Sequence, residues 1–112
     1  MNMIDKNWIE AGRVDDIPLR GARIVRAAWG DIAVFRSAAG DVFALEDRCP
    51  HRHGPLSQGI VHGNSVTCPL HNWVVSLETG EVQGPDQGCA RKIGVRIEGG
   101  VVLLSTEALI KA

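Results

Sequence analysis

Hydrophobic residues in this chain come in short runs with partial alternation, and few stretches show helical spacing. Short runs rich in Val, Ile and Phe, bounded by turn residues, predict half-buried β-strands. Gly99-Gly100 is a strong signal for a tight hairpin, and 38–40 (Ala-Ala-Gly), 79–81 and 84–86 are also expected to turn. The predicted strands are Arg23–Ala28, Asp31–Ser37, Asp41–Glu46, Ser65–Cys68, Trp73–Leu77, Ile93–Glu98 and Val101–Ser105.

This pattern predicts a small all-β domain, either a sandwich or a barrel-like fold. One helical turn is expected at Glu107–Lys111. At 112 residues the chain is expected to form a single domain, residues 1–112. A domain of this size can bury enough surface for a modest core without disulfides.

The charge balance narrows the classes of partner. The net charge is −1, from 12 basic and 13 acidic residues, which argues against nucleic acid or an anionic membrane as the main partner. No apolar run approaches the ~20 residues of a membrane span, and Met1–Glu10 lacks the pattern of a signal peptide. The chain has three cysteines, an odd number that fits ligand duty in a reducing compartment, so a cytoplasmic location is expected.

Two mixed pairs of metal ligands stand out, Cys49-Pro50-His51 and Cys68-Pro69-Leu70-His71. Thiolates suit one iron of a binuclear site and imidazoles suit the other, so Cys49, His51, Cys68 and His71 are the candidate ligands of a [2Fe–2S] cluster. Each pair follows a predicted strand and lies in a turn-forming segment. A zinc site uses the same residue types and remains an alternative, although it usually pairs Cys with Cys and His with His.

Several neighbouring residues have two interpretations. His53 and His62 lie outside the ligand pattern and are expected to face solvent or to form hydrogen bonds rather than bind metal. Cys89 is expected to be a free buried thiol, with a redox role as the alternative. Trp73 either shields the cluster from water or is an ordinary core residue. Residues 53–77 contain no Asp, Glu, Lys or Arg, which indicates either core strands with their turns or an uncharged docking face.

At these residues the chain resembles Rieske iron–sulfur proteins, whose motif is C-x-H followed by C-x-x-H. The resemblance implies stacked antiparallel sheets with two cluster-binding loops at one tip. It also implies that the two cysteines hold the inner iron and that the two histidines hold the outer iron through Nδ1. The segment 84–86 falls where the family has a proline-containing loop over the cluster.

Departures from one branch of that family indicate the subtype. Rieske proteins of respiratory complexes carry two further cysteines, and Gly54 and Leu70 stand in their places here. In those proteins Ser and Tyr hydroxyls also donate hydrogen bonds to the cluster. This chain has no tyrosine, and Trp73 stands where the Ser would be. Fewer donors stabilise the reduced cluster less, so a low-potential site is expected.

Longer segments resemble the small subunit of assimilatory NAD(P)H nitrite reductase. That resemblance implies electron transfer beside a large subunit that carries FAD, siroheme and a [4Fe–4S] cluster and reduces nitrite to ammonium. The chain would then be an oxidoreductase subunit with no complete active site and no catalytic residue of its own. The segments that carry the resemblance are Asp47–His51, Gly54–Gly63, Cys68–Trp73, Leu77–Glu81 and Asp86–Cys89.

Two other functions stay open. A free low-potential Rieske ferredoxin supplying electrons to an aromatic-ring dioxygenase or another oxygenase would have the same size, fold and cluster. A zinc-binding or metal-free interaction module within a larger reductase is the third hypothesis.

Overall fold

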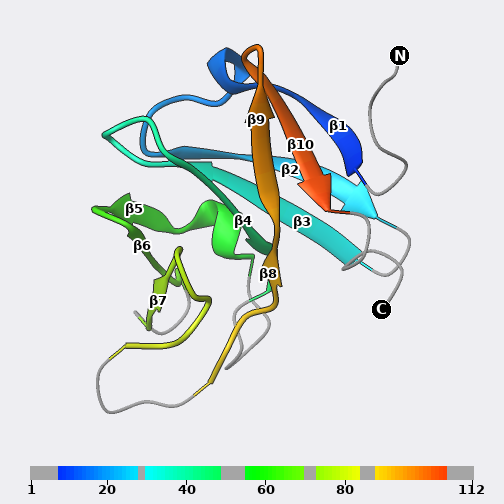
Figure 1. Ribbon diagram of the computed structural model, residues 1–112. Coiled ribbons are helices and arrows are strands. Elements are labelled where there is room, and N and C mark those ends of the chain that lie inside the picture. The colour runs from blue at the N-terminus through cyan, green and yellow to red at the C-terminus, as the bar shows by residue number, and fades with distance from the viewer. Residues whose placement is uncertain (1–7, 28–29, 49–54, 70–72, 84–87, 106–112) are drawn as a thin grey trace.

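The computed structural model describes residues 8–27, 30–48, 55–69, 73–83 and 88–105, which form β-strands and two short 3-10 helices (Figure 1). No helix in these ranges is long and apolar enough to cross a membrane. In chain order the elements are β1 (Trp8–Arg13), η1 (Val14–Asp16), β2 (Gly21–Ala27), β3 (Gly30–Arg36), β4 (Val42–Glu46), η2 (Leu56–Gln58), β5 (Ile60–His62), β6 (Ser65–Thr67), β7 (Val74–Ser76), β8 (Lys92–Ile93), β9 (Val95–Glu98) and β10 (Val101–Ser105).

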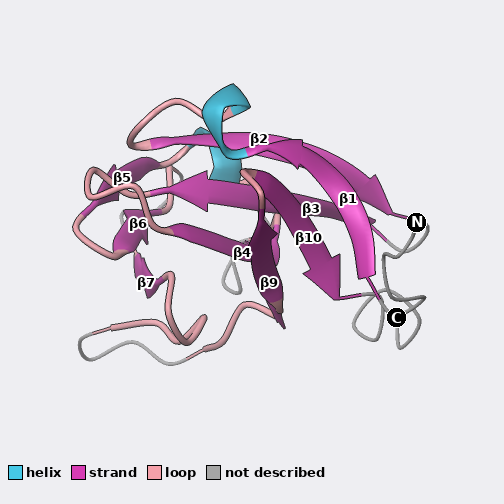
Figure 2. Ribbon diagram, turned by 45° about the horizontal axis from the view of Figure 1, so that its top comes forward, coloured by secondary structure: helices cyan, strands magenta, loops and turns pink. Residues whose placement is uncertain are grey.

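The strands pair into three antiparallel sheets (Figure 2). Sheet A has the order β1-β10-β9, sheet B the order β2-β3-β4-β8, and sheet C the order β5-β6-β7. Adjacent strands in the sequence are mostly neighbours in space, as short connections favour. The all-β expectation of stacked antiparallel sheets is therefore confirmed.

Strand β3 explains why sheet B is the middle layer. Its successive side chains point to opposite faces, and four of them are fully buried. Ile32 and Val34 face a core shared with sheet A, whereas Ala33 and Phe35 face a second core shared with sheet C. We call this second cluster the B/C core. Burial of a side chain the size of Phe35 stabilises the fold by about 1.5–3 kcal/mol.

Most predicted strands are confirmed within a residue or two, and β10 has the predicted bounds. Two strands, β1 and β5, were not predicted. β1 is interrupted by an irregularity between Glu10 and Arg13, and β5 has only three residues between two glycines, so neither carries a clear alternation. The predicted strand 93–98 is divided at Gly94 into β8 and β9, which join different sheets. The predicted helical turn 107–111 and turn 84–86 lie outside the described residues.

Three of the predicted turns, at 99–100, 38–40 and 79–81, lie within the described residues, and all three are confirmed. Gly99 and Gly100 have φ values of +58° and +80°, which suits the two-residue hairpin between β9 and β10. The turn at 38–40 connects β3 to β4; there the Gly40 N–H donates to the Ser37 carbonyl at 2.9 Å, with φ +96° at Gly40. In both places the turn requires a positive φ, a conformation that glycine adopts freely and that residues with a side chain adopt only at a cost.

Several hydrogen bonds and one close backbone contact hold the turn after β7. The buried Ser76 hydroxyl oxygen accepts the N–H groups of Glu78 at 3.2 Å and Thr79 at 3.3 Å. The Gly80 N–H donates to the Ser76 carbonyl at 2.8 Å, and the Gly80 carbonyl accepts the Ala90 N–H at 2.7 Å. A Cβ at Gly80 would overlap the Ala90 carbonyl oxygen, so this turn lies directly against the 88–90 segment.

Gly80→Ala is therefore expected to destabilise the fold more than Gly40→Ala. Both glycines have positive φ, +83° and +96°, but a Cβ at Gly40 would meet nothing within 4 Å. The backbone strain common to both variants should cost about 1–3 kcal/mol. The forced displacement of Ala90 should add about 1–3 kcal/mol in Gly80→Ala alone.

Equilibrium urea unfolding of both variants, followed by tryptophan fluorescence, measures this difference. Equal losses of unfolding free energy in the two variants would contradict the close packing of Gly80 against Ala90.

Candidate metal centre

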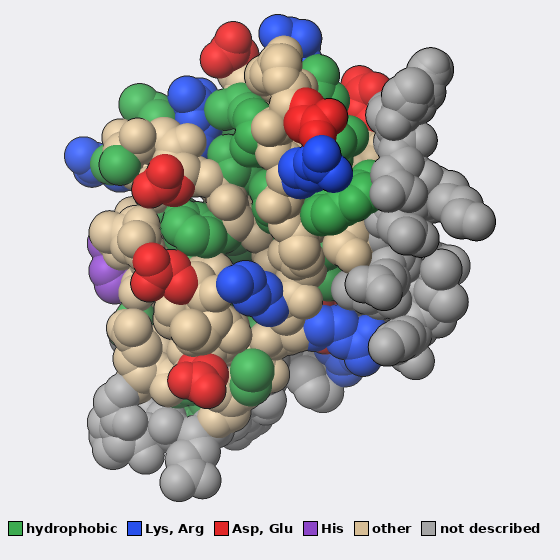
Figure 3. Space-filling model, in the orientation of Figure 1, with side chains coloured by type: hydrophobic (Ala, Val, Ile, Leu, Met, Phe, Trp, Pro, Cys, Tyr) green, Lys and Arg blue, Asp and Glu red, His purple; other side chains and the backbone are tan. Residues whose placement is uncertain are grey.

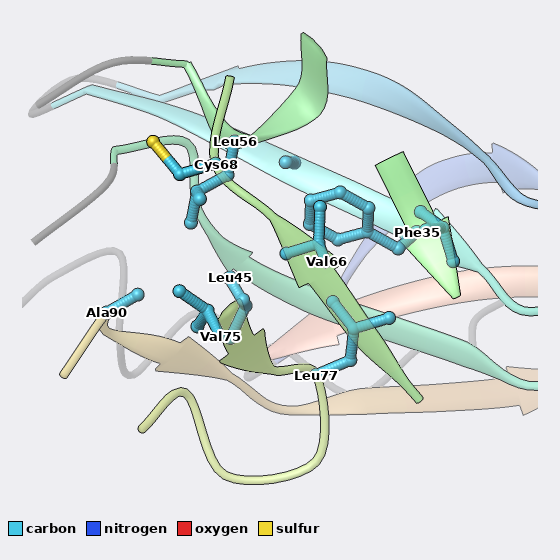
Figure 4. Packing of buried hydrophobic residues seen from close by; sticks show 10 residues of the cluster. Phe35, Leu45, Leu56, Val66, Cys68, Val75, Leu77 and Ala90 are labelled. Atoms are coloured by element: carbon cyan, nitrogen blue, oxygen red, sulfur yellow. The ribbon is translucent and has the colours of Figure 1, made fainter. Parts of the chain in front are cut away.

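Cys68 is the one predicted ligand within the described residues; Cys49, His51 and His71 lie outside them. Cys68 directly follows β6, is fully buried in the B/C core and forms no disulfide. Figure 4 shows its sulfur at the end of that core near Leu56, pointing away from Phe35 and Leu77. A thiol with this placement is sheltered from solvent by the core behind it.

The second ligand segment is closed at its base by a backbone hydrogen bond. The Cys68 N–H donates to the Trp73 carbonyl at 2.7 Å, which brings together the two ends of the segment 69–72 that contains His71. Trp73 is half-buried and packs against the B/C core. This contact supports the core interpretation of Trp73, while shielding of the cluster stays a prediction.

The first ligand segment is closed by a side chain. Both carboxylate oxygens of Asp47 accept hydrogen bonds from Ser57, Oδ1 from the backbone N–H at 2.7 Å and Oδ2 from the hydroxyl at 2.8 Å. These bonds join the two ends of residues 48–56, the segment that contains Cys49 and His51. Neither Asp47 nor Ser57 was predicted as a site residue, because nothing in their spacing resembles a metal ligand or a helix cap.

Backbone pairing joins the residues on either side of the segment 84–87. The Val82 N–H donates to the Gly88 carbonyl at 2.9 Å, and Glu81 and Cys89 form an antiparallel bridge. The expectation that Cys89 is buried is wrong, because its side chain is exposed at this bridge. Its thiol donates to the Ala90 carbonyl at 3.4 Å. Cys89 is a free thiol, as expected.

His62 forms the kind of contact predicted for it. Its ring Nε2 lies 2.7 Å from the Thr67 hydroxyl oxygen across the β5–β6 pair, and its side chain is exposed. His53 lies outside the described residues. Within the described part of the chain, no three His, Cys, Asp or Glu residues gather in a way that could hold a metal ion.

Comparison with known proteins identifies the family. The Rieske [2Fe-2S] domain pattern matches residues 7–96. The chain belongs to the Rieske [2Fe–2S] domain family. The 4beta-methylsterol monooxygenase of Methylococcus capsulatus is 61% identical over 46 residues, which cover 40% of this chain and 12% of the monooxygenase. Oxidoreductase NdmD of Pseudomonas putida is 35% identical over 81 residues, which cover 71% of this chain and 14% of its own length.

A shorter relative is matched over most of its length. The ferredoxin component of the naphthalene 1,2-dioxygenase/salicylate 5-hydroxylase systems of Ralstonia sp is 32% identical over 68% of this chain and 72% of its own length. Among solved structures, the putative NADH-dependent nitrite reductase small subunit of Mycobacterium tuberculosis has a TM-score of 0.79 and 21% identity. That match covers 88% of this chain and 93% of the other, and at this identity it shows the Rieske fold alone.

The described residues fit the cofactor of this family, an iron–sulfur cluster. Iron in such clusters binds thiolate, and Cys68 offers a buried sulfur that no disulfide consumes. The hydrogen bonds from Cys68 to Trp73 and from Ser57 to Asp47 fix the ends of the two segments that hold the other predicted ligands. The structure thus supplies one thiol and two anchored segments.

Cys68→Ala is expected to abolish cluster binding, whereas Cys89→Ala should leave it intact. Both are single thiol deletions, but Cys89 is exposed and bonded to Ala90, whereas Cys68 is buried at the proposed site. Iron and sulfide analysis with visible absorption of the anaerobically purified variants provides the measurement. A red-brown Cys68→Ala protein with full iron content would show that Cys68 is not a ligand.

Proposed function

We propose that this chain is the Rieske small subunit of an assimilatory NAD(P)H-dependent nitrite reductase, an electron-transfer subunit in the cytoplasm. Cys49 and Cys68 would hold one iron of a [2Fe–2S] cluster, and His51 and His71 the other. Such a cluster, when bound, supplies a one-electron redox centre of low potential. FAD, siroheme and a [4Fe–4S] cluster would belong to the large subunit, which reduces nitrite to ammonium.

The observation that carries this proposal is that longer segments of the sequence, beyond the metal ligands, resemble nitrite reductase small subunits. One of them, Leu77–Glu81, forms the turn in which Gly80 approaches Ala90 too closely for any side chain. Another, Cys68–Trp73, is closed by the bond between its first and last residues. These two segments therefore form local structures that close packing and hydrogen bonds hold in place.

The surface of the 53–77 region suits a stable subunit contact. Its described residues, 55–69 and 73–77, carry no charged side chain, and Ile60 on β5 is 71% exposed. On the face drawn in Figure 3, acidic and basic side chains are scattered rather than gathered by sign. Electrostatic steering of a transient partner usually needs a field of one sign, so this surface favours a subunit that stays bound.

A specific observation favours the second candidate, a free low-potential Rieske ferredoxin that supplies an aromatic-ring dioxygenase or another oxygenase. The Ralstonia ferredoxin component is similar to this chain over 72% of its own length, so the two are comparable in size as well as in family. A ferredoxin of this kind would exchange between partners instead of staying with one.

Co-purification separates the two functions. Tagged chain expressed in its native host should retain a large flavin–siroheme protein through washing at high salt, and the complex should oxidise NAD(P)H when nitrite is added. Removal of the small chain should lower that activity. If no such protein is retained, and the chain instead transfers electrons to an oxygenase component, the ferredoxin function is favoured.

His71→Ala tests whether the cluster takes part in nitrite reduction. The variant should lose the outer iron and the colour, yet still bind the large protein, because the 55–69 surface is unchanged. Nitrite-dependent NAD(P)H oxidation should fall at least as far as when the small chain is removed. Unchanged activity would place the cluster off the electron path.

A further inference from the structure

Asp47 occupies a fixed position at one end of the central sheet. Its backbone N–H donates to the Asp31 carbonyl at 2.8 Å, which extends the β3–β4 pairing by one residue. The adjacent Arg48 N–H donates to the Glu46 carbonyl at 2.7 Å, so the chain turns sharply just beyond β4. The Asp47 carboxylate is thus presented from a rigid strand end rather than from a loop.

From this position the carboxylate holds the start of η2. Ser57 donates both its backbone N–H and its hydroxyl to the two oxygens of Asp47, at 2.7 and 2.8 Å. Hydrogen bonds to an ionised carboxylate are about twice as strong as those between neutral groups, and two parallel bonds also fix orientation. The contact sets the distance between the ends of residues 48–56.

Helix η2 is in turn fixed to the second ligand segment. Leu56 is fully buried in the same B/C core as Cys68. Gly59 lies so close to β6 that a Cβ there would overlap the Thr67 carbonyl oxygen, one residue before Cys68. A continuous set of contacts therefore runs from Asp47 through η2 to the strand end that presents Cys68.

We propose that Asp47 is a positioning residue for the cluster. Through Ser57, its carboxylate sets the spacing between the ligand pair Cys49 and His51 and the pair Cys68 and His71. The inference rests on the proposed ligand set. Asp47 does not bind iron in this account; it acts only through the two hydrogen bonds that hold η2 against the end of β4.

The chain offers a matched control at the other end of the same strand. Asp41 precedes β4 as Asp47 follows it, and its side chain is exposed at the β3–β4 turn. Asp41→Ala removes one carboxylate from the protein without touching η2. Ser57→Ala removes only the hydroxyl bond, and Asp47→Asn keeps an acceptor for the Ser57 N–H while it removes the charge.

The test measures iron release to a ferrous chelator, and the electron paramagnetic resonance (EPR) g-values of the reduced cluster, in anaerobically purified full-length protein. Asp47→Ala should release iron about tenfold faster than wild type, the effect expected for loss of hydrogen bonds to a charged group, and its g-values should shift. The release rates and g-values of Ser57→Ala and Asp47→Asn should lie between those of Asp47→Ala and wild type. Those of Asp41→Ala should match wild type.

Wild-type release rates and g-values in Asp47→Ala would overturn the proposal. Faster release with unchanged g-values would also overturn it, because that combination describes a residue that supports the fold without positioning the cluster. If Asp47→Ala does not fold, the release rates and g-values of Ser57→Ala and Asp47→Asn test the proposal instead, since each of these variants keeps one of the two hydrogen bonds between Ser57 and Asp47. A wild-type protein without a cluster would instead remove the ligand assignment, and this inference with it.

Discussion

Both faces of the central sheet are buried, and this two-sided burial determines where the other two sheets lie. Strand β3 sends alternate fully buried residues into two cores, so sheets A and C must both pack on sheet B. Sheet C is short and has little surface of its own to bury. Its place is therefore decided by the B/C core, in which Val66 and Val75 meet Phe35 and Leu45. Cys68, the next residue after β6, is carried to its position by that packing.

Polar contacts add precision where the apolar core ends. A backbone bond joins Cys68 to Trp73, two side-chain bonds join Ser57 to Asp47, and the turn at Gly80 is bonded to Ala90. Each contact closes the base of a segment that the family resemblance assigns to the cluster or to its cover. Sites held by rigid elements keep their geometry better than sites held by free loops.

The sequence predicted the long, strongly patterned parts of the fold and failed where the pattern was short. Strands β3, β4 and β10 are dense in Val, Ile and Phe, whereas β5 has three residues between Gly59 and Gly63 and reads as a loop. Cys89 was placed inside because cysteine is usually buried, but its bridge to Glu81 leaves the thiol exposed. The hydrogen bonds from Ser57 to Asp47 could not be predicted from the sequence, since they depend on how η2 packs against β6. The ligand motif was predicted from its residue types and spacing alone, and it stays a prediction because Cys49, His51 and His71 lie outside the described residues.

We propose that this chain holds a Rieske cluster through two cysteines, Cys49 and Cys68, and two histidines, His51 and His71. Metal and sulfide analysis of the anaerobically purified wild-type protein, with EPR spectroscopy after reduction, tests it most directly. The protein should be red-brown, contain about two iron and two sulfide per chain, and show the spectrum of a cluster with mixed nitrogen and sulfur ligands. A colourless protein with about one zinc per chain would contradict it.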